Sequence, residues 1–183
     1  MSLDTLHLQD GITRLTLAPS IGGAIANWSV IATGQPLLRH ADERALGAGT
    51  PRLLGCYPLA PWSNRITEGG FDNPEGWLAL TANADNSPLP IHGSAWQQPW
   101  QVVEHSERSA LLRLESHIPF AFTAEQRFEL NEGRLTIHLQ VTHRGEAPSW
   151  HGLGLHPYFP RTPHTRLQAA AEQVWHCDAN SLP

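Results

Sequence analysis

Three short segments of the chain gather side chains that could bind and transform a polyhydroxylated small molecule. They are Tyr57–Ile66, which contains Asn64 and Arg65; Ile91-His92-Gly93; and Gly152–Pro160, which contains His156 and Tyr158. Amide and guanidinium groups donate several hydrogen bonds to hydroxyl groups, and aromatic faces suit the apolar faces of a sugar ring. Histidine titrates near neutral pH and can transfer a proton. Together the segments predict a site for a sugar-like ligand, although each residue alone also fits a structural role.

The chain contains 11 histidines, so a metal site is the first alternative to consider. The sequence lacks the H-x-H and H-E-x-x-H spacings, and the adjacent pair His176-Cys177 would diverge on a strand. His138 and His143 face opposite ways on one predicted strand. We therefore expect no metal, and a histidine-rich metal-dependent hydrolase stays only as a third alternative, which elemental analysis would test. Cys56 and Cys177 belong to no C-x-x-C motif and are expected to be buried free thiols.

The composition excludes several further classes of chemistry and partner. All 12 basic residues are arginine, so there is no lysine for a Schiff base or a phosphate loop. Gly152-Leu153-Gly154 lacks the third glycine of a dinucleotide turn, and no G-x-S-x-G is present. With a net charge of −5 and scattered arginines, we expect neither nucleic acid nor a membrane as partner. Residues Met1–Thr5 hold no apolar leader, so we expect a cytoplasmic location.

Short strands joined by turns must position these segments, because 15 glycines and 15 prolines punctuate the apolar runs. Arg134–His143 and Phe122–Leu130 alternate apolar and polar residues, and Asn131-Glu132-Gly133 supplies the turn of a predicted hairpin. Weaker patterns predict strands at Leu6–Leu8, Ile12–Leu17, Ala24–Ile31, Trp77–Thr81, Trp100–Glu104, Ala110–Ser116, Gly152–His156 and Arg166–Ala170.

Helical character is confined to Asp42–Leu46 and Ala169–Trp175, and both segments are short. The sequence therefore predicts an all-β class, an antiparallel β-sandwich that forms one domain over residues 1–183. Long connections at Leu46–Pro61 and Asn83–Ala95 are where a site is expected.

In this order, Asn64-Arg65-Ile66 with a following Gly and Phe, His92-Gly93 and His156-Pro157-Tyr158-Phe159 resemble the motifs of the aldose 1-epimerase, or galactose mutarotase, family. The resemblance covers nearly the whole chain, and it includes Trp28, Pro58–Pro61, Trp175, Asp178 and Leu182-Pro183.

The resemblance implies a large antiparallel β-sandwich that holds a sugar in a groove on one sheet and interconverts α and β anomers of a hexose without a cofactor. It implies that His156 is the general acid, which protonates the ring oxygen. Asn64, Arg65, His92 and Tyr158 would bind the sugar. Proton transfer of this kind contributes about 10²–10⁴-fold to a rate.

The same resemblance implies a general-base glutamate from a later part of the family domain, and no glutamate here occupies the matching motif. We expect the sandwich to be incomplete at the C-terminus, with unpaired edges that favour self-association. The alternative function is a non-catalytic carbohydrate-binding sandwich, or an inactive fragment without the base. The substrate is expected to be a hexose or a hexose phosphate, and Arg52 or Arg161 could bind a phosphate.

Overall fold

Strict alternation of apolar and polar residues produces the two longest strands of the structure, a computed structural model that describes residues 5–85, 87–168, 170–179 and 182. β9 (Phe122–Asn131) pairs antiparallel with β10 (Arg134–His143) along their full length, from Phe122↔His143 to Asn131↔Arg134. The predicted hairpin is confirmed. Every second residue of β9, from Phe122 to Leu130, is buried, which fixes the face that turns inward.

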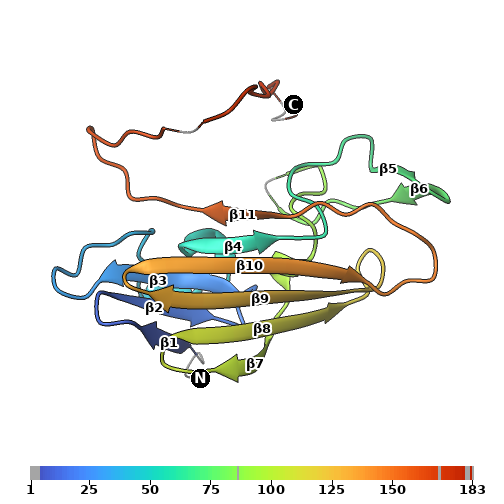
Figure 1. The fold of residues 1–183 in the computed structure, drawn as a ribbon. Helices are drawn as coiled ribbons and strands as arrows, with labels where there is room; N and C mark the ends of the chain where they lie inside the picture. Colours follow the sequence, from blue (N-terminus) through green and yellow to red (C-terminus); the bar gives the residue numbers. More distant parts are fainter. Residues whose placement is uncertain (1–4, 86, 169, 180–181, 183) are drawn as a thin grey trace.

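Two antiparallel sheets form the body of the fold (Figure 1). The first sheet has the order β1-β2-β3-β4-β11, and its strands are β1 (Leu6–Gln9), β2 (Thr13–Ala18), β3 (Ala24–Val30), β4 (Cys56–Leu59) and β11 (Gly154–Pro157). The second sheet has the order β10-β9-β8-β7, with β8 at Ser109–Ser116 and β7 at Gln101–His105. A separate hairpin pairs β5 (Gly70–Asn73) with β6 (Gly76–Ala79).

The core between the sheets combines apolar side chains from both, including Leu15 and Ile25 from the first and Leu112 and Phe128 from the second. All four are almost completely buried. The predicted all-β sandwich is therefore confirmed. A second apolar cluster lies on the other face of the first sheet and contains Tyr57 and Trp96.

The helices within the described part of the chain are short: α1 (Glu43–Gly47) and the 3-10 helices η1 (Pro51–Leu53) and η2 (Ala95–Gln97). Asp42 caps α1 by accepting a hydrogen bond from the Ala45 backbone, so the helical prediction there is confirmed. The predicted long connection Leu46–Pro61 is interrupted by β4, a strand that the sequence analysis missed. No helix among the described residues is long and apolar enough to span a membrane.

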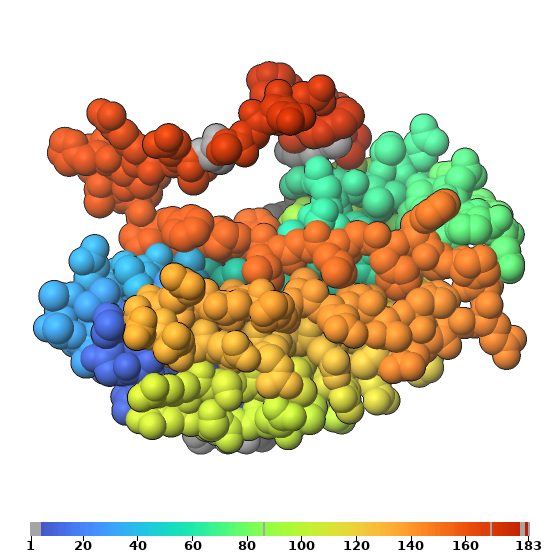
Figure 2. Space-filling model, in the orientation of Figure 1, coloured from blue at the N-terminus to red at the C-terminus, as the bar shows by residue number. Residues whose placement is uncertain are grey.

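The segment after β11 departs from the predictions. Arg166–Ala170 was expected to be a strand and Ala169–Trp175 a helix, but the described residues of both are exposed and irregular, while residue 169 lies outside the described residues. Figure 2 shows this segment standing apart from the sandwich over part of its length. The predictions are wrong because such short segments need a packing partner to become regular. Cys177 is likewise exposed rather than buried, whereas burial raises the pKa of the Cys56 thiol to about 12.

β11 has one sheltered face and one open face. Its half-buried residues Gly154 and His156 alternate with exposed Leu155 and Pro157. Leu155 is 37% exposed and Phe159, just beyond the strand, is 62% exposed. Figure 1 shows why, because β11 lies beyond the edge of the second sheet and that sheet does not cover it.

Candidate active site

The candidate site lies on the outer face of the first sheet, where β4 and β11 run side by side. In β4, Cys56 packs into the core between the sheets and Tyr57 into the cluster on the opposite face. His156 pairs with Tyr57 in the antiparallel register. Because cross-strand partners point to the same face, the His156 side chain lies outside the sandwich core beside Tyr57.

His156 is packed against two tyrosines. Its ring centroid lies 4.8 Å from that of Tyr57 and 4.7 Å from that of Tyr158, and both contacts are stacked. The backbone of Tyr158 is fixed on both sides, because its N–H donates to Gly55 and its carbonyl accepts from Arg39. The Arg39 guanidinium lies 3.7 Å above the Tyr158 ring. Two stacked tyrosine rings therefore hold His156, and the Arg39 cation packs on one of these rings, Tyr158.

His92 reaches the same place from a loop in an unusual backbone conformation. Its φ is +63° and that of Gly93 is +68°. A Cβ on Gly93 would lie 1.9 Å from the carbonyl oxygen of Ala60, so only glycine fits there. The His92 backbone N–H donates to the carbonyl of Asn64 at 3.1 Å, which joins the first motif to the second.

The His92 ring has one nitrogen committed to the protein and one available. Its Nδ1 lies 2.8 Å from the carbonyl oxygen of Ser63. Because a carbonyl only accepts, Nδ1 carries the proton, and Nε2 of the neutral ring is an acceptor. The ring centroid lies 5.3 Å from that of His156 at an interplanar angle of 77°. The two imidazoles thus meet edge to face.

Burial and positive charge both keep these imidazoles neutral. Burial lowers the pKa of His156, and Arg39 and Arg52 lower it further. Burial likewise lowers the pKa of His92, against the hydrogen bond to Ser63, with smaller contributions from His156 and Arg65. Burial also raises the pKa of Tyr57, so its hydroxyl stays protonated. The site therefore offers neutral donors and acceptors in a positive surrounding.

All five predicted site residues lie in one region, but their roles in the structure differ. His92, His156 and Tyr158 form the aromatic cluster with Tyr57. Arg65 is half-buried, and its backbone forms an isolated antiparallel β-bridge with Ile91. Asn64 is exposed, and its backbone carbonyl accepts the hydrogen bond from the His92 N–H. Arg161 is exposed in the segment after β11.

Asn83 is an organising residue that the sequence analysis did not identify. Its Oδ1 accepts from the N–H of Ile91 at 2.7 Å, and its Nδ2 donates to the carbonyls of Ile91 and Gly93 at 2.9 and 2.8 Å. It therefore binds the backbone on both sides of His92. Its place at the start of the long Asn83–Ala95 connection was the only sequence feature that could have indicated it.

Among the described residues, no group of three or more histidine, cysteine, aspartate or glutamate side chains could hold a metal ion. Likewise, no described carboxylate forms a hydrogen bond or ion pair with His92 or His156. The chemistry available at the site is therefore that of imidazole, phenol, guanidinium and amide groups.

Comparison with known proteins assigns this chain to a family. The family model for aldose 1-epimerase matches residues 4–183, and the chain belongs to that family. Its sandwich is of the galactose mutarotase type, as the motifs predicted.

Individual relatives agree with this assignment. A crystal structure of a candidate aldose 1-epimerase from Escherichia coli K12 superposes with a TM-score of 0.89 at 30% identity, over 98% of this chain and 60% of that one. The uncharacterized Escherichia coli K12 protein YphB is 34% identical over 76% of this chain and 47% of its own length. A galactose mutarotase related enzyme from Lactobacillus acidophilus, 16% identical over 90% of this chain and 52% of that one, shares the fold with a TM-score of 0.68. The chain thus spans about half to three fifths of the length of these relatives.

Proposed function

We propose that this chain carries the acid half of an aldose 1-epimerase site, with His156 as the general acid that opens the hexose ring. The observation that carries the proposal is the pairing of His156 with His92 between aromatic faces, on residues that follow the motif order of the family. An apolar sugar face stacks well on such rings, while the ring nitrogens and Arg65 meet the hydroxyl groups.

In the proposed reaction, the protonated imidazole of His156 donates its proton to the ring oxygen O5. The C1–O5 bond breaks as a base removes the proton of the C1 hydroxyl, and C1 becomes an aldehyde carbon. Rotation about C1–C2 and ring closure on the other face then give the second anomer. His92, with Nδ1–H bonded to Ser63, accepts a hydrogen bond from a sugar hydroxyl through Nε2. Asn64 and Tyr158 are proposed as further sugar-binding residues.

The lowered pKa of His156 has two opposing effects on this role. It makes the imidazolium a stronger acid, but it reduces the protonated fraction at neutral pH. The acid step should therefore be faster at a pH below 6.5 than at pH 8, as long as the chain stays folded.

NMR exchange between the α and β anomers of glucose and galactose tests the proposal. We expect the chain to accelerate exchange over buffer, and the variant His156→Ala to lose about 10²–10⁴-fold of that acceleration. The matched control is His138→Ala, which removes an exposed histidine from the outer face of the second sheet. Equal acceleration by the His156→Ala variant would contradict the assigned acid.

The second candidate is a carbohydrate-binding module that does not catalyse anomer exchange. It is favoured by one observation, that no described carboxylate contacts either histidine to serve as the base. Binding of glucose detected by chemical-shift changes at His92 and His156, without any acceleration of exchange, would support this candidate over the enzyme.

A further inference from the structure

The candidate acid stands on an edge strand, so contacts from outside the sheet help to hold it. In the described part of the chain, β11 pairs with β4 and with no second strand. Just beyond β11, the Tyr158 N–H donates to the carbonyl of Gly55 at 2.8 Å, and the Tyr158 carbonyl accepts from the Arg39 N–H at 2.7 Å. Because Arg39 lies between β3 and α1, the second of these bonds ties the end of β11 to another part of the fold.

The Arg39 side chain covers the ring of the same tyrosine. Its guanidinium carbon lies 3.7 Å from the Tyr158 ring centroid, within the range of a cation–π contact. Its Nε donates to the carbonyl of Leu54 at 3.0 Å, and its Nη2 donates to the carbonyls of Leu54 and Arg52. Because the guanidinium is planar and these bonds fix its plane, the Tyr158 ring packs on a surface of fixed orientation.

Tyr158 passes this restraint on to His156. The two ring centroids lie 4.7 Å apart at an interplanar angle of 25°. Tyr57 stacks on the same imidazole at 4.8 Å. Burial and, next, a side-chain hydrogen bond with Tyr158 raise the pKa of Tyr57, so the two tyrosines are also joined to each other. The position of the imidazole therefore depends on the position of the Tyr158 ring.

We propose, building on the proposed function, that Arg39 is a positioning residue for the general acid, whose imidazole it holds in place through the ring of Tyr158. It acts from outside the three motif segments and needs no contact with the sugar. Among the described residues, no carboxylate forms an ion pair with Arg39. One side chain therefore provides both a fixed surface for Tyr158 and a positive charge that acts on His156.

The charge of Arg39 gives this role a signature in the pH dependence of the reaction. Burial is the largest cause of the lowered pKa of His156, and the charges of Arg39 and Arg52 lower it further. The titratable and charged groups that contact His156 or act on it are Tyr57, Tyr158, His92, Arg39 and Arg52. Without the charge of Arg39, the pKa of His156 rises, and the acid stays protonated to a higher pH.

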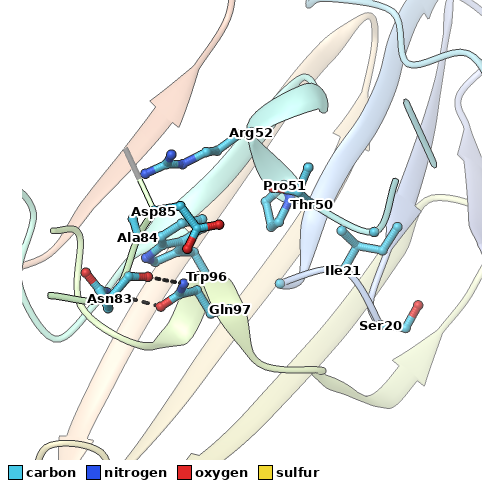
Figure 3. Close-up of a pocket in the computed structure, with 12 residues that line it drawn as sticks. Ser20, Ile21, Thr50, Pro51, Arg52, Asn83, Ala84, Asp85, Trp96 and Gln97 are labelled. Carbon is cyan, nitrogen blue, oxygen red and sulfur yellow. Dashed lines mark hydrogen bonds between the residues drawn. The ribbon is translucent and has the colours of Figure 1, made fainter. Parts of the chain in front are cut away.

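Arg52, the second arginine that acts on His156, has different surroundings. Its guanidinium carbon lies 5.0 Å from the Trp96 ring centroid, and it lines a cavity of about 510 Å³ together with Thr50 and Gln97 (Figure 3). Its backbone carbonyl is one of the groups that orient Arg39. Arg39 is therefore the arginine to change in a test of positioning through Tyr158.

NMR exchange between the anomers of glucose, measured with the full chain as a function of pH, tests the proposal. Each profile gives the limiting rate of the form with protonated His156 and the pH at which that rate falls by half. Arg39→Gln should lose about 10- to 100-fold of the limiting acceleration, because the imidazole is no longer held in place, and should shift the midpoint to higher pH. Arg39→Lys keeps the cation but not the planar fork, so it should lose less of the limiting rate and keep the midpoint.

The matched control is Arg134→Gln, which removes an exposed arginine at the start of β10 and should alter neither quantity. A folded Arg39→Gln variant with the limiting rate of this control would overturn the proposal, as would an Arg39→Lys variant whose midpoint shifts as far as that of Arg39→Gln. Circular dichroism establishes folding. If Arg39→Gln does not fold, Arg39→Lys decides, since a lowered limiting rate supports the proposal and an unaltered one overturns it.

The imidazole resonances of His156 separate this inference from the proposed function, because they require no turnover. In Arg39→Gln they should shift and titrate at a higher pH than in Arg134→Gln, and unshifted resonances would overturn the positioning role. Shifted resonances without acceleration of exchange by the unaltered chain would contradict the enzyme and support the positioning of His156 by Arg39. Exchange that is lost in His156→Ala and unaltered in Arg39→Gln would do the reverse.

Discussion

The chain holds two histidine pairs whose rings have nearly the same geometry and very different surroundings. His92 and His156 lie with centroids 5.3 Å apart at 77°, and His143 and His151 lie 5.3 Å apart at 80°. In the second pair, His143 Nε2 donates to the carbonyl of Ala147 at 2.8 Å, and its Nδ1 accepts from His151 Nε2 at 3.1 Å. Both nitrogens of His143 are therefore used inside the protein.

The first pair differs from the second in the arginines that surround it and in the tyrosine rings stacked on His156. Among the described residues, His92 has a hydrogen-bond partner at Nδ1 alone, and beyond the effect of burial, arginines lower the pKa of both His92 and His156. The second pair packs on Phe120, and burial lowers the pKa of His151, with a smaller contribution from the neighbouring His143. The edge-to-face contact of two imidazoles alone thus does not mark the candidate site, which is distinguished by the arginines that lower the pKa of both of its histidines.

The largest effect is expected from Gly93→Ala, which disturbs the frame of the first pair without changing either ring. The new Cβ would overlap the Ala60 carbonyl at a positive φ, so we expect a loss of about 3 kcal/mol or more in the free energy of unfolding. Urea denaturation measures it. Gly47→Ala is the control, because its Cβ would meet no atom within 4 Å. A Gly93→Ala variant as stable as the Gly47→Ala variant would show that the loop is not held as described.

The next effect compares the two pairs directly through activity. His92→Gln should lower the acceleration of anomer exchange about 10- to 100-fold, because the variant loses the Nε2 acceptor proposed for a sugar hydroxyl and leaves that hydroxyl without its partner. His143→Gln should leave exchange unchanged, since its ring is engaged with Ala147 and His151. Equal losses in both variants, measured by NMR exchange, would remove the distinction between the pairs.

A smaller loss of stability is expected when the asparagine that binds the backbone near each histidine pair is removed. Asn83 binds the backbone around His92, while Asn73 accepts from the Trp150 N–H at 3.0 Å and the Ser149 hydroxyl at 3.1 Å, next to His151. Asn83→Ala and Asn73→Ala should each cost about 1–2 kcal/mol of stability. Only Asn83→Ala should shift the ring resonances of His92. An unshifted His92 in that variant would refute its positioning role.

The smallest effect is on the pH dependence of stability. Burial lowers the pKa of His92, His156 and His151 relative to the unfolded chain, so the unfolded chain takes up these protons more readily. Their contribution to stability is complete above pH 6.5 and is lost as the pH falls through the lowered values. Urea denaturation at pH 7.5 and pH 5 should show this loss, and His156→Gln should reduce it. An identical pH dependence in that variant would contradict the burial of a neutral His156.

The alternation of apolar and polar residues predicted the strands that have one apolar and one polar face. The alternation in Arg134–His143 is sufficient to identify β10, and it has the predicted bounds. β4 was missed because all four of its residues are buried and include Pro58, so no alternation marks it. The segment after Arg166 has weak strand and helix patterns, but it lacks the packing that would make either one regular.

The candidate site residues were predicted from short motifs, and the prediction omitted residues whose contacts depend on the folded chain. The structure brings His92, His156 and Tyr158 together, and the sequence identified them because they belong to recognisable short motifs. Arg39 and Asn83 lie outside those motifs, and their contacts with Tyr158 and Ile91 arise only when distant loops meet. Pairwise contacts of this kind leave no periodic trace in a single sequence.

β11 is an edge strand of its sheet, so the fraction of molecules in which the candidate site is assembled depends on how often this strand opens locally. Among the described residues β11 is paired on one side only, with β4, through four residue pairs from Gly154↔Leu59 to Pro157↔Cys56. Each excursion of this rim away from β4 would carry His156 away from Tyr57 and His92. The N–H groups of Gly152 and Tyr158 donate to residues on either side of β4, so those of Gly154 and His156 point the same way, and deuterium uptake at these two amides reports the fraction of molecules whose imidazoles are assembled. Any partner or chain segment that covers the open Leu155 face would raise that fraction.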